Sequence, residues 1–324
     1  MTDISTWLNG RLAGVVHDAV DPFSRVSAPH WALAAGFALL AYRLYVARGR
    51  LSLGEFVRYL APAAVWRHGS VLTDVKVYLF NALFEPARLL LFGASAAVAA
   101  TGVATLLTGA FGAAPVQFGS GPVATLALGV LMMLAIDLSS YVNHRLAHQV
   151  PALWAFHRVH HSAEVLTPLT LLRKHPVYDV ASTAMDIVVV APVQGLLLYF
   201  WGAQMGAGVL VVVNVGFLLF GLMAGALRHS HVWLSFGPVL NRLVISPAMH
   251  QIHHSTAARH WNRNYGEVFA VWDVLFATAY LPREKEELAF GLGEPQPHPG
   301  LRQALLEPFA FAAARLAPRP EPAR

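Results

Sequence analysis

Long apolar stretches dominate this sequence and restrict the folds open to it. Five of them, each of about 18 residues or more, lie at 31–48, 79–105, 121–142, 180–200 and 206–227. A stretch of this length crosses a bilayer as one α-helix. Only 13% of the residues are charged, against about 25% in a typical soluble domain. The sequence therefore predicts an all-α membrane protein with about four to five transmembrane helices.

Basic residues indicate which helix ends face the cytosol. They concentrate at the end of the first apolar stretch and after the first, third and fifth stretches, at Arg43, Arg48, Arg50, Arg58, Arg67, Lys76, Arg145, Arg158, Arg173, Lys174 and Arg228. Because cytosolic loops are enriched in Lys and Arg, we expect these segments on the cytosolic side of a multi-pass protein, in a bacterial inner membrane. The net charge of +5 is scattered rather than gathered in a stripe, so nucleic acid is not an expected partner.

Three regions are expected along the chain. Residues 1–118 form an N-terminal membrane region with two spans. Residues 119–310 form a domain whose last two spans join tightly at about 201–206 as an antiparallel hairpin. The Pro-rich, polar tail 311–324 is predicted to be disordered. A cleaved signal peptide is not expected, since no basic segment followed by an apolar core begins the sequence.

Two N-terminal segments allow more than one interpretation. Residues 51–70 mix aromatic, aliphatic and basic side chains, as in a helix lying in the membrane interface, but a plain connecting loop fits equally well. The apolar stretch 79–105 contains Glu85, Pro86 and Arg88. We expect this span either to be kinked or to begin only after Arg88.

Histidines occur in three clusters at helical spacing. The clusters are His144 with His148, His157 with His160 and His161, and His250 with His253 and His254. Residues three and four apart share a helix face, so each cluster can direct its imidazoles at one point. Eight imidazoles are too many for one ion, which predicts two neighbouring metal ions. The chain has no cysteine, and nitrogen ligands suit iron, copper or zinc.

A polar stripe leads along the third span to the first cluster. Asp137, Tyr141, His144 and His148 follow one another at spacings of four, three and four residues. A carboxylate inside a membrane span is costly and usually functional. Asp137 could orient a liganding imidazole through its ring N–H, or form a structural hydrogen bond to a neighbouring helix.

Distinct motifs surround these histidines, within roughly residues 120–310, namely HRLAH, FHRVHHS, RKHP, PAMHQIHHS, NYG and WDVLFAT. This set resembles the motifs of the fatty acid hydroxylase and sterol desaturase superfamily. Two positions depart from the family pattern, namely His231 in place of Asn and Ala277 in place of Gly.

The resemblance implies a histidine-rich, non-haem di-iron centre, which we expect in a helical cap on the cytosolic side because the basic residues put the histidine clusters there. Its ligands would be the eight clustered histidines together with His229. His175 and His231 are tentative additions, as a ligand, a group near the site or a structural residue. Asp273 or Asn264, in the WD and NYG motifs, could hold a ligand imidazole in the required tautomer, although a plain capping role also fits Asn264. His17, His30, His68, His260 and His298 lie outside the clusters and are expected on the surface.

The implied reaction is O2-dependent hydroxylation or desaturation of a C–H bond in a membrane lipid, which could be a fatty acyl chain, a sterol or an aminolipid. No nucleotide-binding fingerprint is present, so a ferredoxin or cytochrome with its reductase would supply electrons. Two other classes stay open, a membrane zinc hydrolase and a membrane protein that carries metal or haem. The sequence predicts no oligomeric state.

Overall fold

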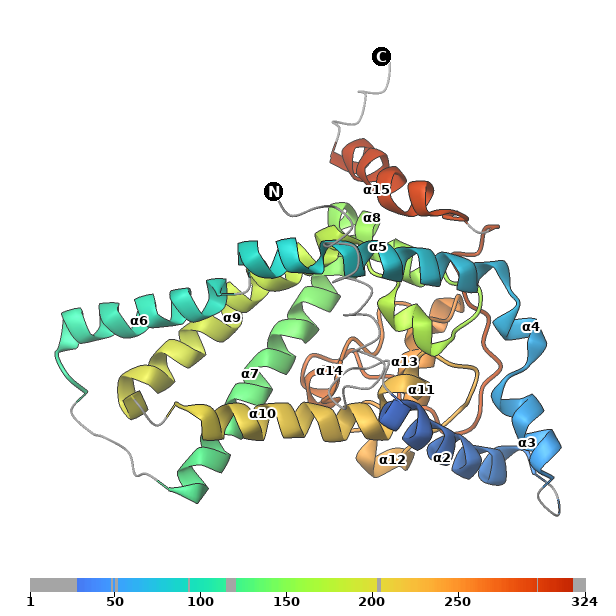
Figure 1. Cartoon of the computed structure of the whole chain (residues 1–324), viewed down its shortest axis with the longest axis horizontal. Coiled ribbons are helices and arrows are strands. Elements are labelled where there is room, and N and C mark those ends of the chain that lie inside the picture. Colours follow the sequence, from blue (N-terminus) through green and yellow to red (C-terminus); the bar gives the residue numbers. More distant parts are fainter. Residues whose placement is uncertain are drawn as a thin grey trace, which may run out of the picture.

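Helices account for nearly all regular structure in this protein. The computed structural model describes residues 28–47, 49, 52–92, 94–114, 121–202, 205–295 and 297–316. Within these ranges there is no strand, and β pairing is limited to one isolated bridge between Val244 and Phe269. The prediction of an all-helical chain is confirmed (Figure 1).

Within the described ranges, two helices are long and apolar enough to cross a membrane. They are α7 (Pro122–Gln149, 28 residues) and α9 (Pro176–Trp201, 26 residues), where the third and fourth spans are expected. Shorter apolar helices occupy the other expected spans, namely α2 (Ala28–Tyr45), α6 (Ser95–Phe111) and α10 (Ala207–Phe220). The number of spans therefore stays a prediction.

The expected span at 79–105 is not one helix. Helix α5 (Gly69–Phe92) continues past Arg88 and ends at Phe92, and α6 then begins at Ser95. The two helices differ in chemistry. The part of α5 up to Asn81 carries polar side chains that bond to the loops near the histidines, and the Asn81 amide donates to Lys174 O at 2.8 Å. Helix α6 has no charged residue, so one straight span would not suit both environments.

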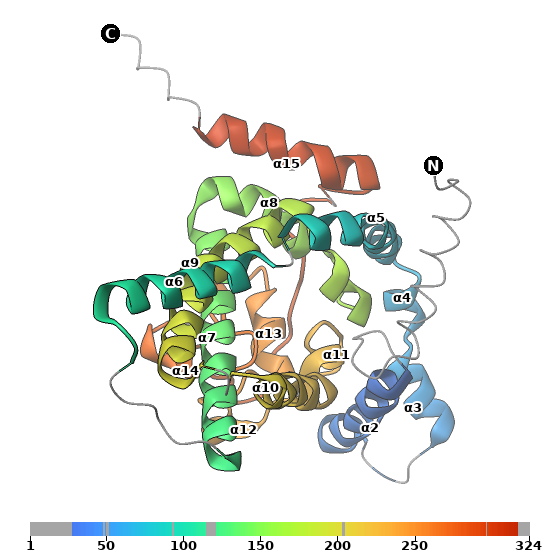
Figure 2. The same cartoon turned by 60° about the vertical axis from the view of Figure 1, so that its left-hand side comes forward.

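Glycines allow close helix packing in the apolar part of the molecule. A Cβ added to Gly129 of α7 would lie 2.3 Å from the Val212 side chain of α10, and one added to Gly195 of α9 would lie 2.5 Å from Val103 of α6. Small residues serve the same purpose between membrane helices generally. The predicted hairpin of α9 and α10 is wrong in its packing, because α10 lies against α7 and α9 lies between α6 and α7 (Figures 1 and 2).

Helix α10 is followed by an irregular stretch. The helix stops at Phe220, and a π-helical segment, Gly221–Gly225, leads into the one-turn helix α11 (Ala226–Arg228). Such segments are frequent at functional sites. The expected span at 206–227 is therefore regular only as far as Phe220. The irregular stretch and α11 then lead the chain to His229.

The segment 51–70 contains two short helices. Helix α3 (Leu53–Leu60) is capped by Ser52, whose hydroxyl accepts from Glu55 N, and α4 is Ala63–Trp66. Leu53 is 79% exposed. An exposed apolar side of this kind suits the interfacial helix better than the plain loop.

A group of short helices and loops carries the histidines. It contains α8 (Pro151–His161), η1 (Pro168–Leu172), α11, α12 (Gly237–Leu240), α13 (Pro247–His253), η4 (Ala258–His260) and α14 (Val271–Leu275), and α15 (Leu301–Leu316) packs on α8 (Figure 1). The predicted disorder is wrong for residues 311–316. They belong to α15, because Ala312 is buried against Ala155 and Phe156. Residues 317–324 lie outside the described ranges.

Candidate metal centre

A sharp turn brings the first two histidine clusters together. Helix α7 stops at Gln149 and α8 starts at Pro151, so that Val150 caps both helices. Proline favours the first turn of a helix and disfavours helical backbone in the residue before it. The turn places the His148 ring 4.7 Å from the His161 ring, and the His144 ring 4.8 Å from the His157 ring.

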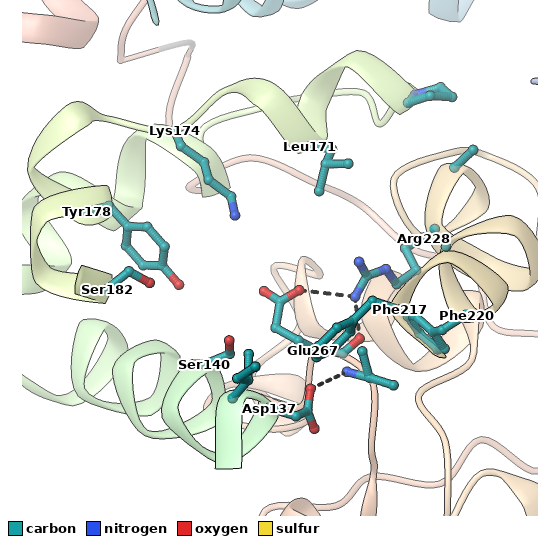
Figure 3. Close-up of a pocket in the computed structure, with 16 residues that line it drawn as sticks. Asp137, Ser140, Leu171, Lys174, Tyr178, Ser182, Phe217, Phe220, Arg228 and Glu267 are labelled. Atoms are coloured by element: carbon teal, nitrogen blue, oxygen red, sulfur yellow. Dashed lines mark hydrogen bonds and ion pairs between the residues drawn. The ribbon is translucent and has the colours of Figure 1, made fainter. Parts of the chain in front are cut away.

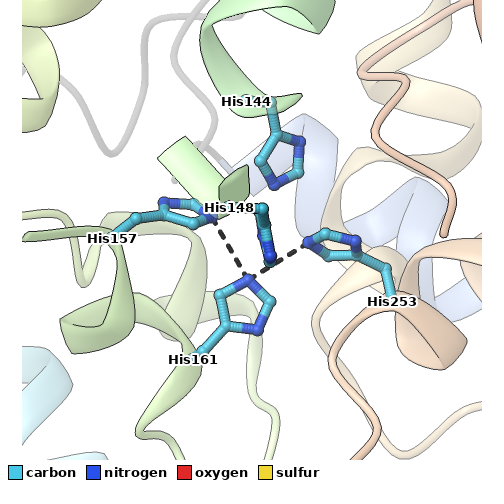
Figure 4. A group of neighbouring side chains, drawn as sticks. All are labelled: His144, His148, His157, His161 and His253. Carbon is cyan, nitrogen blue, oxygen red and sulfur yellow. Dashed lines mark hydrogen bonds between the residues drawn. The ribbon is translucent and has the colours of Figure 1, made fainter. Parts of the chain in front are cut away.

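Five imidazoles form one group. They belong to His144, His148, His157, His161 and His253, and one ring nitrogen from each lies within 4.8 Å of the others. Figure 4 shows the five rings directed at a common centre. The His161 Nε2 atom lies 3.2 Å from His157 Nε2 and 3.1 Å from His253 Nε2.

Four imidazoles form a second group. They are His160, His229, His250 and His254, and all four are buried. The His229 Nε2 atom lies 3.1 Å from His160 Nε2, 3.1 Å from His254 Nε2 and 2.9 Å from His250 Nε2. The two groups adjoin, because the rings of His161 and His254 stack with their centroids 4.3 Å apart.

The two H-x-x-H-H clusters are divided between the groups in the same way. In each cluster the two histidines that are four residues apart belong to one group, and the histidine between them belongs to the other. Thus His157 and His161 enter the five-histidine group while His160 enters the four-histidine group. At 100° per residue, positions four apart differ by about 40° around a helix, and adjacent positions by about 100°. Each of these two clusters therefore spans both groups, so the expectation that a cluster directs its imidazoles at one point is wrong for them.

The chemistry of the two groups fits metal ions. Burial and then the ammonium of Lys174 lower the pKa of His160 to about 3. Burial, followed by neighbouring histidines, lowers the pKa of His161 and His254 well below the usual value. Such imidazoles stay neutral and keep a lone pair. At a metal–nitrogen distance of about 2.1 Å, ligand nitrogens would lie about 3.0 to 3.4 Å apart, close to the separations found here.

Backbone carbonyls orient two of the rings. The Nδ1 atom of His144 lies 2.8 Å from Tyr265 O, and that of His253 lies 2.8 Å from Arg263 O. A neutral ring that donates from Nδ1 presents the lone pair of Nε2. The His144 Nε2 atom is buried without a hydrogen-bond partner, as expected of a ligand atom.

The part of the chain from residue 129 to residue 278 matches the family model of the fatty acid hydroxylases, and it includes all nine histidines. This part is a fatty acid hydroxylase domain. The resemblance predicted from the motifs is confirmed.

Curated relatives are similar to about half of this chain. The ornithine lipid hydroxylase OlsE of Rhizobium tropici is 29% identical over 163 residues, which are 50% of this chain and 45% of the relative. The alkylglycerol monooxygenases of Xenopus tropicalis and Homo sapiens are 28% and 27% identical, over 51% and 50% of this chain and 33% and 32% of the relatives. The chain thus spans less than half the length of these relatives. No solved structure matches it.

The polar residues of the NYG and WD motifs act on the backbone of the hydroxylase domain rather than on an imidazole. Asp273 accepts hydrogen bonds from Tyr265 N and Gly266 N, both at 2.8 Å. The Asn264 amide donates to Met249 O and Tyr280 O, both at 3.0 Å. The expectation that they hold a ligand ring directly is wrong, because backbone carbonyls of the loop they fix accept from the rings.

Asp137 forms structural hydrogen bonds, the second of the two roles that the sequence allowed for it. Its carboxylate accepts from Val268 N at 2.9 Å, Phe269 N at 3.0 Å and Trp272 Nε1 at 2.9 Å. The orientation of an imidazole by Asp137 is therefore not found. Instead Asp137 ties α7 to the loop that carries Tyr265.

A buried ion pair that the sequence interpretation missed supports α8. Arg173 and Asp74 are fully buried, and Arg173 Nη1 lies 3.2 Å from Asp74 Oδ1. The same guanidinium donates to Val159 O at 2.9 Å and to Ser162 Oγ at 2.7 Å. It thus holds the end of α8 that bears His160 and His161. Asp74 lies outside the resembling region, so no motif pointed to it.

The tentative ligands lie outside both groups. His175 caps α9 by accepting from Val177 N at 3.1 Å, and its Nε2 lies 3.0 Å from Leu305 O. The Nε2 atom of His231 lies 2.6 Å from Tyr59 O. The hydrogen bonds of the two rings are all with backbone groups, which favours structural roles.

Other histidines also differ from expectation. His260 and His298 were expected on the surface but are buried, at 3.1 Å from Glu286 and 3.2 Å from Glu307 respectively. Their carboxylate neighbours compensate for the lost hydration. His17 and the side chain of His30 lie outside what the structure describes.

Two cavities adjoin the centre. One, of about 310 Å³, lies among α7, η1, α9, α10 and the loop at Glu267, with Tyr178 in its wall. The Tyr178 ring stacks on His157 at 4.8 Å, so this cavity is one side chain away from the five-histidine group. The other, of about 370 Å³, is lined directly by His148, His161, His253 and His254.

Proposed function

We propose that the chain is an O2-dependent di-iron oxidoreductase that hydroxylates a C–H bond of a membrane lipid. The observation that carries this proposal is the pair of buried groups, with five and four imidazoles. Nine nitrogen donors suit two ions, and iron is among the metals that prefer imidazole. The named relatives are a lipid hydroxylase and lipid monooxygenases, which favours hydroxylation over desaturation.

Iron bound there would supply the electron transfer to O2 that breaking an unactivated C–H bond requires. The overall reaction consumes the lipid, O2, two electrons and two protons and yields the hydroxylated lipid and water. The protein keeps the imidazoles neutral by burial and fixes the rings of His144 and His253 through Tyr265 O and Arg263 O. The cavity beside Tyr178 lies next to α7 and α9, so a lipid would enter it from the bilayer.

A membrane location with the centre on the cytosolic side completes the proposal. Apolar side chains such as Leu106 and Phe111 (both 74% exposed), Val188 (65%) and Leu210 (62%) face outward from α6, α9 and α10. A bilayer would cover these surfaces. Since the chain has no cysteine, a single cysteine at the exposed Leu275 tests orientation. An impermeant thiol reagent should label it only in inverted membrane vesicles.

The two electrons would come from a separate ferredoxin or cytochrome with its reductase. Such a donor would approach over the second cavity, where imidazoles of both groups line the wall. NADPH alone should support no turnover by the purified protein, and adding a ferredoxin and its reductase should restore it.

The decisive experiment combines metal analysis with lipid mass spectrometry. We expect two iron atoms per chain and an O2-dependent mass gain of one oxygen atom in a lipid. His250→Ala should abolish the product, whereas His68→Ala, at a histidine outside both groups, should leave it. Zinc in the purified protein, with an activity that does not need O2, would overturn the proposal in favour of a hydrolase.

A further inference from the structure

The cavity beside Tyr178 combines an apolar wall with charged side chains (Figure 3). Leu171, Phe217 and Phe220 contribute apolar surface. Lys174, Arg228 and Glu267 contribute charge, and Ser140 and Ser182 contribute hydroxyl groups. A cavity that took only hydrocarbon would gain nothing from buried charges, since their desolvation costs free energy.

Lys174 is the cation that lacks an ionic partner here. Its ammonium points into the cavity in Figure 3 and lies 5.5 Å from the centre of the Tyr178 ring. Within the described part of the chain, no carboxylate oxygen lies within 4.0 Å of it. A cation facing a partly apolar space is stabilised by an anion that enters that space.

The other charges of the cavity are already engaged. Arg228 Nη1 lies 3.2 Å from Glu267 Oε2, and only 5% of the Arg228 side chain is exposed. The Asp137 carboxylate accepts three N–H groups from the loop and from Trp272. Among the charged groups that line the cavity, the Lys174 ammonium is thus the one to which the described residues offer neither an ion-pair nor a hydrogen-bond partner.

These charges lie close to the histidines. After burial, the largest influence on the pKa of His160 is Lys174, which lowers it, while Glu267 raises it. Arg228 directly precedes His229. A polar group bound at Lys174 would therefore lie near the four-histidine group.

We propose that this cavity binds a lipid whose polar part carries an oxyanion, either a carboxylate or a phosphate, which pairs with the ammonium of Lys174. The identity of this lipid as the substrate rests on the function proposed above. Uncharged lipids such as sterols and alkylglycerols would leave Lys174 without an anion, so they would bind less well.

Lipid binding by the metal-free full-length protein in detergent tests this inference without turnover. The probes are an ornithine lipid with a free carboxylate, a phosphatidic acid and an uncharged 1-O-alkylglycerol, matched in chain length. Lys174→Met should weaken binding of an oxyanion lipid about tenfold or more, as loss of a charged hydrogen bond predicts. Lys174→Arg should retain most of the affinity, and Lys285→Met, the same change at an exposed lysine, should retain all of it.

Each outcome has a distinct meaning. Preference for the ornithine lipid or for the phosphatidic acid supports the inference and identifies the oxyanion as carboxylate or phosphate. Equal binding of the alkylglycerol, or unchanged binding by a folded Lys174→Met variant, overturns it. If binding depends on Lys174 but the iron-loaded protein oxidises no lipid, the proposed function fails while the binding site stands.

Discussion

At the scale of single residues, the loop at 263–266 aligns two of the nine imidazoles. Tyr265 O and Arg263 O accept from His144 and His253, and Asp273 in turn accepts from the N–H groups of Tyr265 and Gly266. The Asp273 carboxylate therefore acts on the metal centre indirectly. It holds Tyr265 by one hydrogen bond, and Tyr265 O holds the His144 ring by another. Asp273 acts as a positioning residue without touching a ligand ring.

Asp273→Ala should therefore weaken metal binding while all nine histidines remain. Loss of a group that orients a ligand typically costs about 10- to 100-fold in metal affinity. Competition with a chelator would measure the dissociation constant, and Glu287→Ala at an exposed position serves as the control. An unchanged affinity in a variant of unchanged helicity would rule out this role.

The ion pair of Arg173 and Asp74 makes a second prediction at this scale. Arg173→Met should destabilise the protein by about 3–5 kcal/mol, because it leaves a buried carboxylate without its cation. Asp74→Leu in the same chain should restore much of that stability. Thermal unfolding of the two single variants and the double variant measures the coupling, with Arg302→Met at an exposed arginine as control. If the double variant lost as much stability as the two single variants together, Arg173 and Asp74 would not stabilise each other.

At the scale of elements, two close contacts between α7 and α10, each made at a glycine, fix the position of α7. Gly129 faces Val212 of α10, and Gly216 of α10 faces Met133 of α7, each with only 2.3 Å available for an added Cβ. The histidines at the end of α7 depend on this placement, since the same helix ends in His144 and His148.

Gly129→Ala should destabilise the protein by about 1–3 kcal/mol through overpacking. Gly36→Ala in α2, where nothing lies within 4 Å of an added Cβ, should instead be neutral or gain up to about 1 kcal/mol from helix propensity. Thermal unfolding followed by circular dichroism compares the two variants. The same effect from both substitutions would show that the contact is not tight.

At the scale of the whole molecule, folding buries many imidazoles in a neutral state. Burial is the largest cause of a lowered pKa at each histidine of the two groups outside α7, namely His157, His160, His161, His229, His250, His253 and His254. In the unfolded chain these residues take up protons below a pH of about 6.5. At a pH between the pKa of a histidine in the folded chain and its pKa in the unfolded chain, the unfolded state binds more protons. The free energy of unfolding therefore falls as the pH falls.

The metal-free protein should accordingly lose stability on acidification below a pH of about 6.5. Each histidine contributes about 1.4 kcal/mol per pH unit between its two pKa values. Melting temperatures in detergent from pH 8 to pH 5 measure the slope, and the double variant His160→Gln, His250→Gln should show a shallower one. A melting temperature independent of pH in this range would contradict the prediction.

The sequence alone determined the helical class and the identity of the histidines that meet. Helical spacing predicted eight of them, because residues three and four apart must share a face, and the family resemblance added His229. The tertiary structure decided how the nine divide into five and four, since spacing does not say which of two facing centres a ring will reach. It also decided that Tyr265 O and Arg263 O orient the rings, and that Asp74 supports α8. These contacts join residues from 10 to 121 positions apart along the chain, and only the folded backbone brings such partners together.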